Sequence, residues 1–257
     1  VTRARSSLSS LHQYGGASGY NTSLEIAYAM PSSGDQVYFS FWRYHAKTSD
    51  SWSRNVKPWI VYGSTGLTPS AYDGWGSPIA DSDFRNAVQD SDLSSPTLWG
   101  GPSLDEVEGT WCRIEVLLKQ SSASTDDGSF QVWVHETSTP SISLVQSDTS
   151  YATRSTSDYW TQWFFGAYHA ADDPADATAL VYLDDIYFDS TPVRVEIGNA
   201  DTWAACTKRE VQPATAWSIS QITFTPCLSA FSASDTVYIY VLDSSNSATL
   251  VQSAVVA

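Results

Sequence analysis

The sequence predicts an all-β protein in which a large β-sandwich is followed by a smaller one. Apolar and polar residues alternate with a period of two along many short segments, as in half-buried strands. Gly, Pro, Ser and Asp separate these segments, and no stretch keeps the 3.6-residue apolar period of a helix. With 257 residues, of which 42% are hydrophobic, the chain is long enough to bury a sizeable core.

The clearest strand pair spans residues 109–135 and predicts a β-hairpin whose turn contains an Asp-Gly pair. One face of both strands is apolar. The other face mixes aromatic, charged and polar residues: Trp111, Arg113, Glu115, Gln131, Trp133 and His135. We expect this second face to be the floor of a ligand groove, with Trp133 partly exposed.

The other strands of the first sandwich are predicted from the same alternation. In chain order they are residues 23–30, 37–45, 55–62, 141–147, 160–169 and 178–189. Pro58 places the third of them at a sheet edge or a bulge. Gly63 ends that strand and opens a long irregular region, which is either functional or hides short strands. Its aromatic residues either pin a loop to the sheet or contact a ligand.

The character of the chain changes at Pro192, which predicts two domains, residues 1–192 and 193–257. The first part carries a net charge of −13 and the second a net charge of −2. In the second part, residues 193–197, 216–224 and 236–242 have the pattern of strands. Short strands in about 65 residues suit a small immunoglobulin-like β-sandwich that serves as a spacer or attachment module.

Composition excludes several classes of function. The chain has 28 acidic and 13 basic residues, unlike a nucleic-acid binder. Its longest apolar runs have the length of strands, so we expect no membrane insertion. Abundant Ser, Thr and Asp with few Lys favour an extracellular or particle-surface protein, a virion surface included. Cys206 and Cys227 either form a disulfide or stay reduced.

Five short motifs occur in an order that resembles the concanavalin A-like lectin/glucanase superfamily, and its polysaccharide-lyase-like members in particular. They are YFSFW at 38–42, NVK at 55–57, GTWCRIE at 109–115, DGSFQVW at 127–133 and YLDDIY at 182–187. The resemblance covers roughly residues 20–190. It implies a β-jelly-roll of two curved antiparallel sheets with glycans bound on the concave face. The tail from Arg194 resembles small sandwich modules appended to secreted or phage-encoded proteins.

The first function we expect is glycan binding in an aromatic-lined groove, with a polysaccharide or other glycan as the partner. Aromatic rings suit the apolar faces of sugars, and a few polar side chains fix their orientation. The expected ligand-binding residues are Trp42, Lys57, Trp59, Arg113, Glu115, Gln131 and Trp133.

A polysaccharide lyase acting on uronate-containing glycans is an alternative. The resemblance implies a Tyr or His base that abstracts the proton beside a uronate carboxylate, and a neighbouring group that neutralises the carboxylate. Tyr168, His135 and Arg113 are the candidates, although Tyr168 also suits simple packing and the family's Arg-rich strand has no clear counterpart. The paired-carboxylate strand of jelly-roll glycoside hydrolases is absent from the sequence, so we do not expect hydrolysis.

Two further expectations concern metal and assembly. Asp184, together with Asp172 and Asp173, offers the carboxylates that a structural Ca²⁺ prefers, unless these residues form a solvated acidic loop. The third function class is a structural protein, a decoration or fibre component of a virion or another extracellular assembly. Its partners would be copies of itself, and the fold alone does not choose among the three classes.

Overall fold

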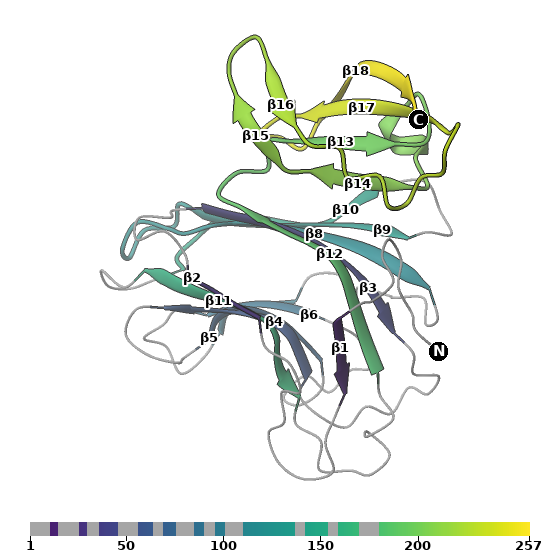
Figure 1. The fold of residues 1–257 in the computed structure, drawn as a ribbon. Helices are drawn as coiled ribbons and strands as arrows, with labels where there is room; N and C mark the ends of the chain where they lie inside the picture. The colour runs from purple at the N-terminus through teal and green to yellow at the C-terminus, as the bar shows by residue number, and fades with distance from the viewer. Residues whose placement is uncertain are drawn as a thin grey trace.

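The computed structural model confirms the all-β fold class (Figure 1). The structure describes residues 11–14, 26–29, 36–45, 56–63, 69–75, 85–89, 96–100, 110–136, 142–153, 159–169 and 180–257. These residues form eighteen strands and one 3₁₀ turn, η2 (Trp203–Ala205), with no α-helix among them. Within the same ranges, no helix has the length and apolar character needed to span a bilayer.

The first sandwich consists of two six-stranded antiparallel sheets, here called sheet I and sheet II. Sheet I has the order β1 (Leu11–Tyr14), β12 (Leu180–Asp189), β3 (Gln36–His45), β8 (Trp111–Lys119), β9 (Gly128–Glu136) and β10 (Ile142–Tyr151). Sheet II has the order β2 (Ile26–Ala29), β11 (Trp160–His169), β4 (Val56–Gly63), β5 (Pro69–Trp75), β6 (Arg85–Gln89) and β7 (Pro96–Gly100). The region after Gly63 that the sequence left irregular therefore contains three strands of sheet II.

The main core lies between the two sheets and confirms the alternation read from the sequence. The inward positions of β3, β8 and β9 are fully buried apolar residues: Val37, Phe39, Phe41, Ile114, Val116, Leu118, Phe130 and Val132. Sheet II contributes Trp59, Val61, Trp160 and Trp163. Aromatic rings meet across the sandwich, with the Trp163 ring 5.2 Å from that of Phe39. Burial of this apolar area is the main term that stabilises the two-layer fold.

Residues 193–257 form a four-stranded sheet, here called sheet III, and a separate two-stranded hairpin. Sheet III has the order β14 (Arg209–Gln212), β13 (Arg194–Gly198), β17 (Thr236–Leu242) and β18 (Ala248–Val255). The strand expected at residues 216–224 is instead the hairpin of β15 (Ala214–Trp217) and β16 (Ile222–Phe224). Its turn is closed by a hydrogen bond from Ser218 N to Gln221 O at 2.8 Å. Six strands are one fewer than a constant-type immunoglobulin domain has, so the immunoglobulin-like assignment stays a prediction.

Sheet III lies over the outer face of sheet I, the face that points away from sheet II (Figure 1). The connection between β12 and β13 is short, and Gln36 Nε2 donates a 3.1 Å hydrogen bond to Ser190 O beside it. Along β13, Arg194 and Glu196 alternate with Val195 and Ile197. The charged pair makes contacts with sheet I, and the apolar pair therefore occupies the opposite face of sheet III.

The three cysteines are free in the structure. Cys112 and Cys206 are buried, and Cys227 is exposed. The Cys206 Sγ lies 3.4 Å from Thr202 O and 3.6 Å from Ala200 O, which anchors the turn around η2. Of the two alternatives for Cys206 and Cys227, the structure therefore has the reduced one.

Candidate functional site

The outer face of sheet I carries the side chains that the sequence predicts for it, but it is not an open groove. Trp133 is only 8% exposed and Trp42 only 1% exposed. Trp133 packs in an apolar cluster with Tyr38 and Leu117 on this face. The prediction of a solvent-facing aromatic groove here is wrong, because sheet III and the loops around it lie against this side of sheet I.

The expected groove residue Trp59 is also placed elsewhere. It is fully buried in the core between the two sheets, where its ring meets the Phe39 ring edge-on at 4.9 Å. The physical reason is the alternation along β4, which puts Trp59 on the same face as the core residue Val61. Trp59 therefore stabilises the sandwich and cannot stack on a sugar.

Arg113 and Glu115, expected to contact a glycan, instead join sheet I to sheet III through a buried ionic network. Arg113 Nε lies 3.2 Å from Glu115 Oε1, and Arg113 Nη2 lies 2.6 Å from Glu196 Oε1. From the other side, Arg194 Nη2 lies 2.8 Å from Glu115 Oε2, and Arg194 Nε lies 2.7 Å from Glu196 Oε1. All four side chains are at most 2% exposed. The two Arg–Glu pairs therefore form one closed arrangement across the interface.

Neutral donors add hydrogen bonds to the Oε2 atom of each glutamate. Tyr38 Oη and Asn246 Nδ2 each donate a 3.0 Å hydrogen bond to Glu115 Oε2. Trp203 Nε1 donates a 2.8 Å hydrogen bond to Glu196 Oε2. Buried charges are tolerated only when they are paired and hydrogen-bonded in this way. Through these contacts the network connects sheet I to sheet III.

The electrostatics of the network keep both glutamates ionised. Burial by itself would raise the pKa of Glu196, but the positive charges of Arg113, Arg194 and Arg209 outweigh burial and hold that pKa well below its usual range. The pKa of Glu115 is lowered for the same reason, against the opposing effect of burial. Burial raises the pKa of Tyr38 far above its usual value, so the phenol remains a hydrogen-bond donor.

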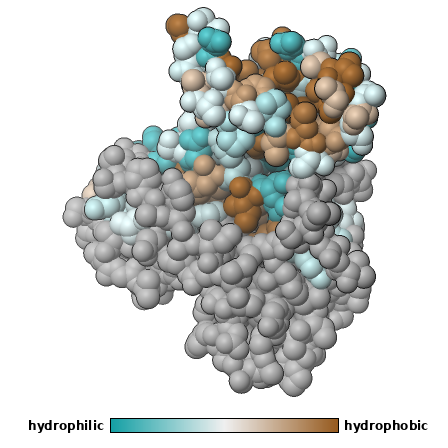
Figure 2. Space-filling view, viewed as in Figure 1, coloured by the Kyte–Doolittle hydropathy of each residue, from teal (hydrophilic) through white to brown (hydrophobic). Residues whose placement is uncertain are grey.

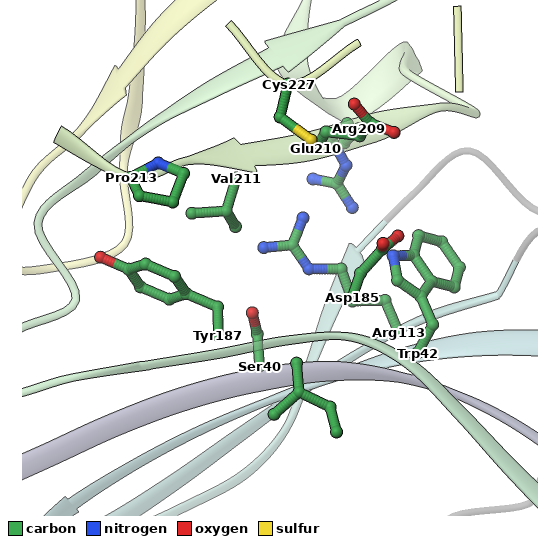
Figure 3. A pocket seen from close by; sticks show the side chains of 11 residues that line it. Ser40, Trp42, Arg113, Asp185, Tyr187, Arg209, Glu210, Val211, Pro213 and Cys227 are labelled. Atoms are coloured by element: carbon green, nitrogen blue, oxygen red, sulfur yellow. The ribbon is translucent and has the colours of Figure 1, made fainter. Parts of the chain in front are cut away.

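A cavity of about 200 Å³ lies beside this network, between sheet I and sheet III (Figure 3). Its lining comes from β3, β8 and β12 on one side and from β14 and the following segments on the other: Ser40, Trp42, Arg113, Asp185, Ile186, Tyr187, Arg209, Glu210, Val211, Pro213 and Cys227. Trp42 and Arg113, two of the predicted ligand-binding residues, therefore border a cavity that only the second part of the chain completes.

The structure does not assemble the three predicted lyase residues. His135 is the Cα partner of Arg113 in sheet I, where it is fully buried with its ring 5.5 Å from the Trp42 ring. Tyr168 lies on β11 in sheet II. The set is wrong as a single catalytic group, because His135 and Arg113 belong to the covered face of sheet I and Tyr168 belongs to the other sheet.

Sheet II instead brings Lys57 and Tyr168 together. They are direct Cα partners on the neighbouring strands β4 and β11, next to a bulge between Phe165 and Tyr168. Their side chains are outside the described part of the structure. Directly paired residues of an antiparallel ladder have their Cβ atoms about 4.5–5.5 Å apart. The backbone thus places a predicted ligand-binding lysine and the predicted base at adjacent positions.

The remaining predicted residues have simple placements. Gln131, half-buried, donates a long 3.4 Å hydrogen bond from Nε2 to Ser147 Oγ on β10. Asp184 is 9% exposed, and its Oδ1 accepts a 2.9 Å hydrogen bond from the Asp185 backbone. The other two candidate calcium ligands, Asp172 and Asp173, lie outside the described residues. No group of three or more metal-binding side chains occurs within the described ranges, and the calcium site stays a prediction.

Sequence reasoning missed Arg194, Glu196 and Arg209 as partners of the outer face of sheet I. A signal was present, because Arg113-Ile-Glu115 and Arg194-Val-Glu196 repeat one Arg-aliphatic-Glu pattern on two strands. Alternation puts the two charges of each triplet on one face, and two such faces are complementary when they meet.

Comparisons with known proteins bear on the fold. Neither the family models nor the curated protein sequences gave a match to the chain. Among solved structures, the chain is similar to the alginate lyase Aly36B, with a TM-score of 0.51 and 14% identity over 71% of this chain and 81% of that one. A lysine-and-tyrosine double mutant of Aly36B in complex with an alginate tetrasaccharide has a TM-score of 0.53 and 15% identity, with the same coverage.

A marine PL-14 alginate lyase from Aplysia kurodai has a TM-score of 0.46 and 13% identity over 62% of this chain and 71% of that one. The two Aly36B likenesses show that the two-sheet sandwich has a jelly-roll fold like that of this alginate lyase. The resemblance that the sequence motifs suggested is thereby supported for the fold of the first part of the chain. The likeness to these structures gives no support to an immunoglobulin-like module in the second part of the chain.

Proposed function

We propose that the chain binds a uronate-containing polysaccharide on sheet II and that Lys57 and Tyr168 are its central contacts. The observation that carries the proposal is the direct Cα pairing of these two residues on β4 and β11. The same pairing supports β-elimination as the accompanying reaction. The glycan-binding residues expected on sheet I no longer support an open groove, because they are buried.

The chemistry of a uronate suits this pair of residue types. A lysine ammonium beside the carboxylate neutralises its charge and stabilises the carbanion character that develops when the neighbouring C–H proton is removed. A tyrosine phenolate can accept that proton, and the phenol can then protonate the leaving glycosidic oxygen. The alginate lyase complex mentioned above supports the idea, since it combines a similar fold with replaced lysine and tyrosine residues and a bound oligouronate.

The overall charge of the protein limits how such a ligand is recognised. The net charge of −15 repels an anionic polysaccharide at long range. Binding must therefore depend on short-range contacts with local groups such as Lys57. We expect affinity to increase as salt screens the repulsion, up to the point where salt also weakens the contact with Lys57.

The test is to measure binding and cleavage of alginate, polygalacturonate and hyaluronate in parallel. Calorimetry reports affinity, and ultraviolet absorbance of unsaturated uronate ends reports elimination. Tyr168→Phe should reduce turnover at least about 100-fold, the low end of general acid–base catalysis, while binding changes little. Lys57→Met should weaken binding.

Tyr159→Phe is the matched control, since Tyr159 is an exposed residue just before β11 and its replacement should leave both signals unchanged. Binding without elimination would refute the lyase step and leave a glycan-binding protein. If neither binding nor elimination is observed with any of the three polymers, the proposal as a whole is refuted.

A second function, self-assembly through the C-terminal part, is favoured by a separate observation. Trp217, Ile219 and Val251 are 46%, 107% and 55% exposed. They line an apolar groove of about 600 Å³ between sheet III and the hairpin of β15 and β16. Figure 2 shows brown, apolar residues gathered over β17 and β18 in the same part of the molecule.

We propose that a second copy of the chain covers this surface, with the edge strand β18 pairing with its counterpart. The eight residues of β18 carry no charge, whereas exposed edge strands of monomers are usually guarded by charged residues. The net charge of residues 193–257 is only −2, against −13 for the rest, so two copies repel each other least at this end. Such a contact would make the protein a component of an assembly.

Sedimentation velocity tests this second function. The wild-type chain should show concentration-dependent dimers, and Val251→Glu should shift it to the monomer because two like charges would face each other across the pair. Ala123→Glu, which adds the same charge to the exposed turn between β8 and β9, is the control. A wild-type chain that stays monomeric at high micromolar concentration would contradict the proposal.

A further inference from the structure

The cavity between sheet I and sheet III contains a buried cation whose hydrogen-bonding groups are unused. Arg209, the first residue of β14, is fully buried. Its Nε, Nη1 and Nη2 atoms all lack a hydrogen-bond partner in the described part of the chain. Its guanidinium carbon lies 4.2 Å from the centroid of the Trp203 ring, so the ring covers one face of the group. A buried guanidinium normally uses several of its five N–H donors.

A second guanidinium group faces the same space. Arg113 also lines the cavity, and its Nη1 has no hydrogen-bond partner, whereas its Nε and Nη2 atoms serve the ionic network. Figure 3 shows the guanidinium groups of Arg209 and Arg113 pointing toward one another into the cavity. Two like charges directed at one space in a low-dielectric interior repel each other unless an anion lies between them.

The charges in and beside the cavity are mixed, with three arginines and four carboxylates, so the case for an anion depends on the unused donors and not on net charge. Arg113, Arg194 and Arg209 are three cations, while Glu115 and Glu196 are the two anions that contact them or act on them most strongly. Two more carboxylates border the cavity. Glu210 Oε1 accepts bonds from Ser229 Oγ and Ala230 N at 2.8 and 2.7 Å, and Figure 3 shows this carboxylate turned away from the two guanidinium groups. Asp185 lies to one side, next to Trp42.

We propose that this cavity is a binding site for a small oxyanion, held between the guanidinium groups of Arg113 and Arg209. A carboxylate, sulfate or phosphate group presents two or more oxygens to the unused N–H groups, in the fork-to-fork geometry that guanidinium groups favour. The cavity of about 200 Å³ corresponds to about seven waters at roughly 30 Å³ each, which leaves room for such a group. Ser40 provides a further hydroxyl group in its lining.

The location gives the site a consequence. Arg113 belongs to sheet I and Arg209 to sheet III, so the anion would contact both parts of the chain and strengthen their association. The site is independent of the function proposed for Lys57 and Tyr168, because those residues belong to sheet II. Either proposal can fail without the other.

The direct test is calorimetric titration of the full chain with sodium sulfate, sodium phosphate and sodium glucuronate, each compared with sodium chloride at equal ionic strength. The three arms separate inorganic anions from a sugar carboxylate. We expect saturable binding of at least one oxyanion and none of chloride. Arg209→Met should raise its Kd at least about tenfold through the loss of charge-assisted hydrogen bonds. Arg209→Lys, which keeps the charge but not the fork, should give a smaller increase.

Lys208→Met is the matched control, because it removes an exposed positive charge beside Arg209 without reaching the cavity. Its Kd should equal that of the wild type. The proposal would be overturned if chloride bound as tightly as every oxyanion. It would also be overturned if Arg209→Met left the Kd of the oxyanion unchanged.

A measurement on the wild-type chain covers the case in which Arg209→Met does not fold. Cys227 lines the cavity and is exposed, whereas Cys112 and Cys206 are buried. The bound oxyanion should slow alkylation of Cys227 by iodoacetamide at least severalfold, relative to chloride at equal ionic strength. An alkylation rate that no oxyanion changes would overturn the proposal.

Discussion

Replacing Glu196 by glutamine is the sharpest test of the buried network. The change keeps the volume of the side chain and removes its charge. Glu196 is fully buried and accepts three short hydrogen bonds, from Arg113 Nη2 at 2.6 Å, Arg194 Nε at 2.7 Å and Trp203 Nε1 at 2.8 Å. In the variant, an amide NH₂ group faces these donors, and the positive charges of the arginines lose their nearest counter-charge.

The expected loss is large because the affected charges cannot reach water. Removing one partner of a buried ion pair lowers the free energy of unfolding by about 3–5 kcal/mol. For a protein of this size that corresponds to a fall of roughly 6–20 °C in Tm, at about 2–4 °C per kcal/mol. Urea denaturation at pH 7 measures the difference. Asp126→Asn is the control, since Asp126 is exposed on the turn between β8 and β9 and its loss should change the free energy of unfolding by at most about 0.5 kcal/mol.

The pH dependence of this difference has a definite sign. The folded-state pKa of Glu196 lies below its ordinary value, so its contribution to stability is fully present above the unfolded pKa of about 4.3. That contribution is lost as the pH falls through the folded pKa. The gap between wild type and Glu196→Gln should therefore be constant from pH 6 to 8 and shrink below about pH 4. A gap under about 1 kcal/mol at pH 7 would refute the claim that Glu196 holds buried charges together.

Two further predictions concern the C-terminal part and calcium. A chain that ends at Ser190 should lose solubility or unfold more easily than the full chain, because Arg113 and Glu115 lose Arg194 and Glu196 and the cluster around Trp133 becomes exposed. A soluble fragment with unchanged Tm would contradict this and show that residues 1–190 fold independently. Millimolar calcium should raise the Tm of the full chain, and Asp184→Asn should abolish the rise; equal shifts in both chains would exclude Asp184 as a ligand.

The alternation of side chains was readable from local sequence, and the structure confirms it in detail. The faces predicted for β8 and β9 are the ones observed, because successive residues of a strand point to opposite sides whatever lies beyond the sheet. Pro192 lies between β12 of sheet I and β13 of sheet III, and the division into two domains stays a prediction. The strands between residues 63 and 108 were not located from the sequence, since Gly, Pro and Ser interrupt the period in β5 and β7 and β6 has only five residues.

The use of each face was decided by tertiary structure alone. The sequence shows that Trp42, Arg113 and Trp133 share the face opposite the core, but it does not show that sheet III covers them. A strand face that mixes aromatic and charged residues can be covered by a ligand or by another part of the same chain. The alternation of residues along the strand is the same in the two cases, so the sequence alone does not distinguish them.

Long-range pairing has the same limitation. Lys57 and Tyr168 become neighbours only through the register of β4 with β11, and Arg113 meets Arg209 only because β14 lies over β8. Such contacts depend on how sheets stack and on which strands pair, and these are set by the total apolar area buried and the complementarity of whole faces. A single strand carries the pattern of its own two faces, and its partners are chosen by the fold as a whole.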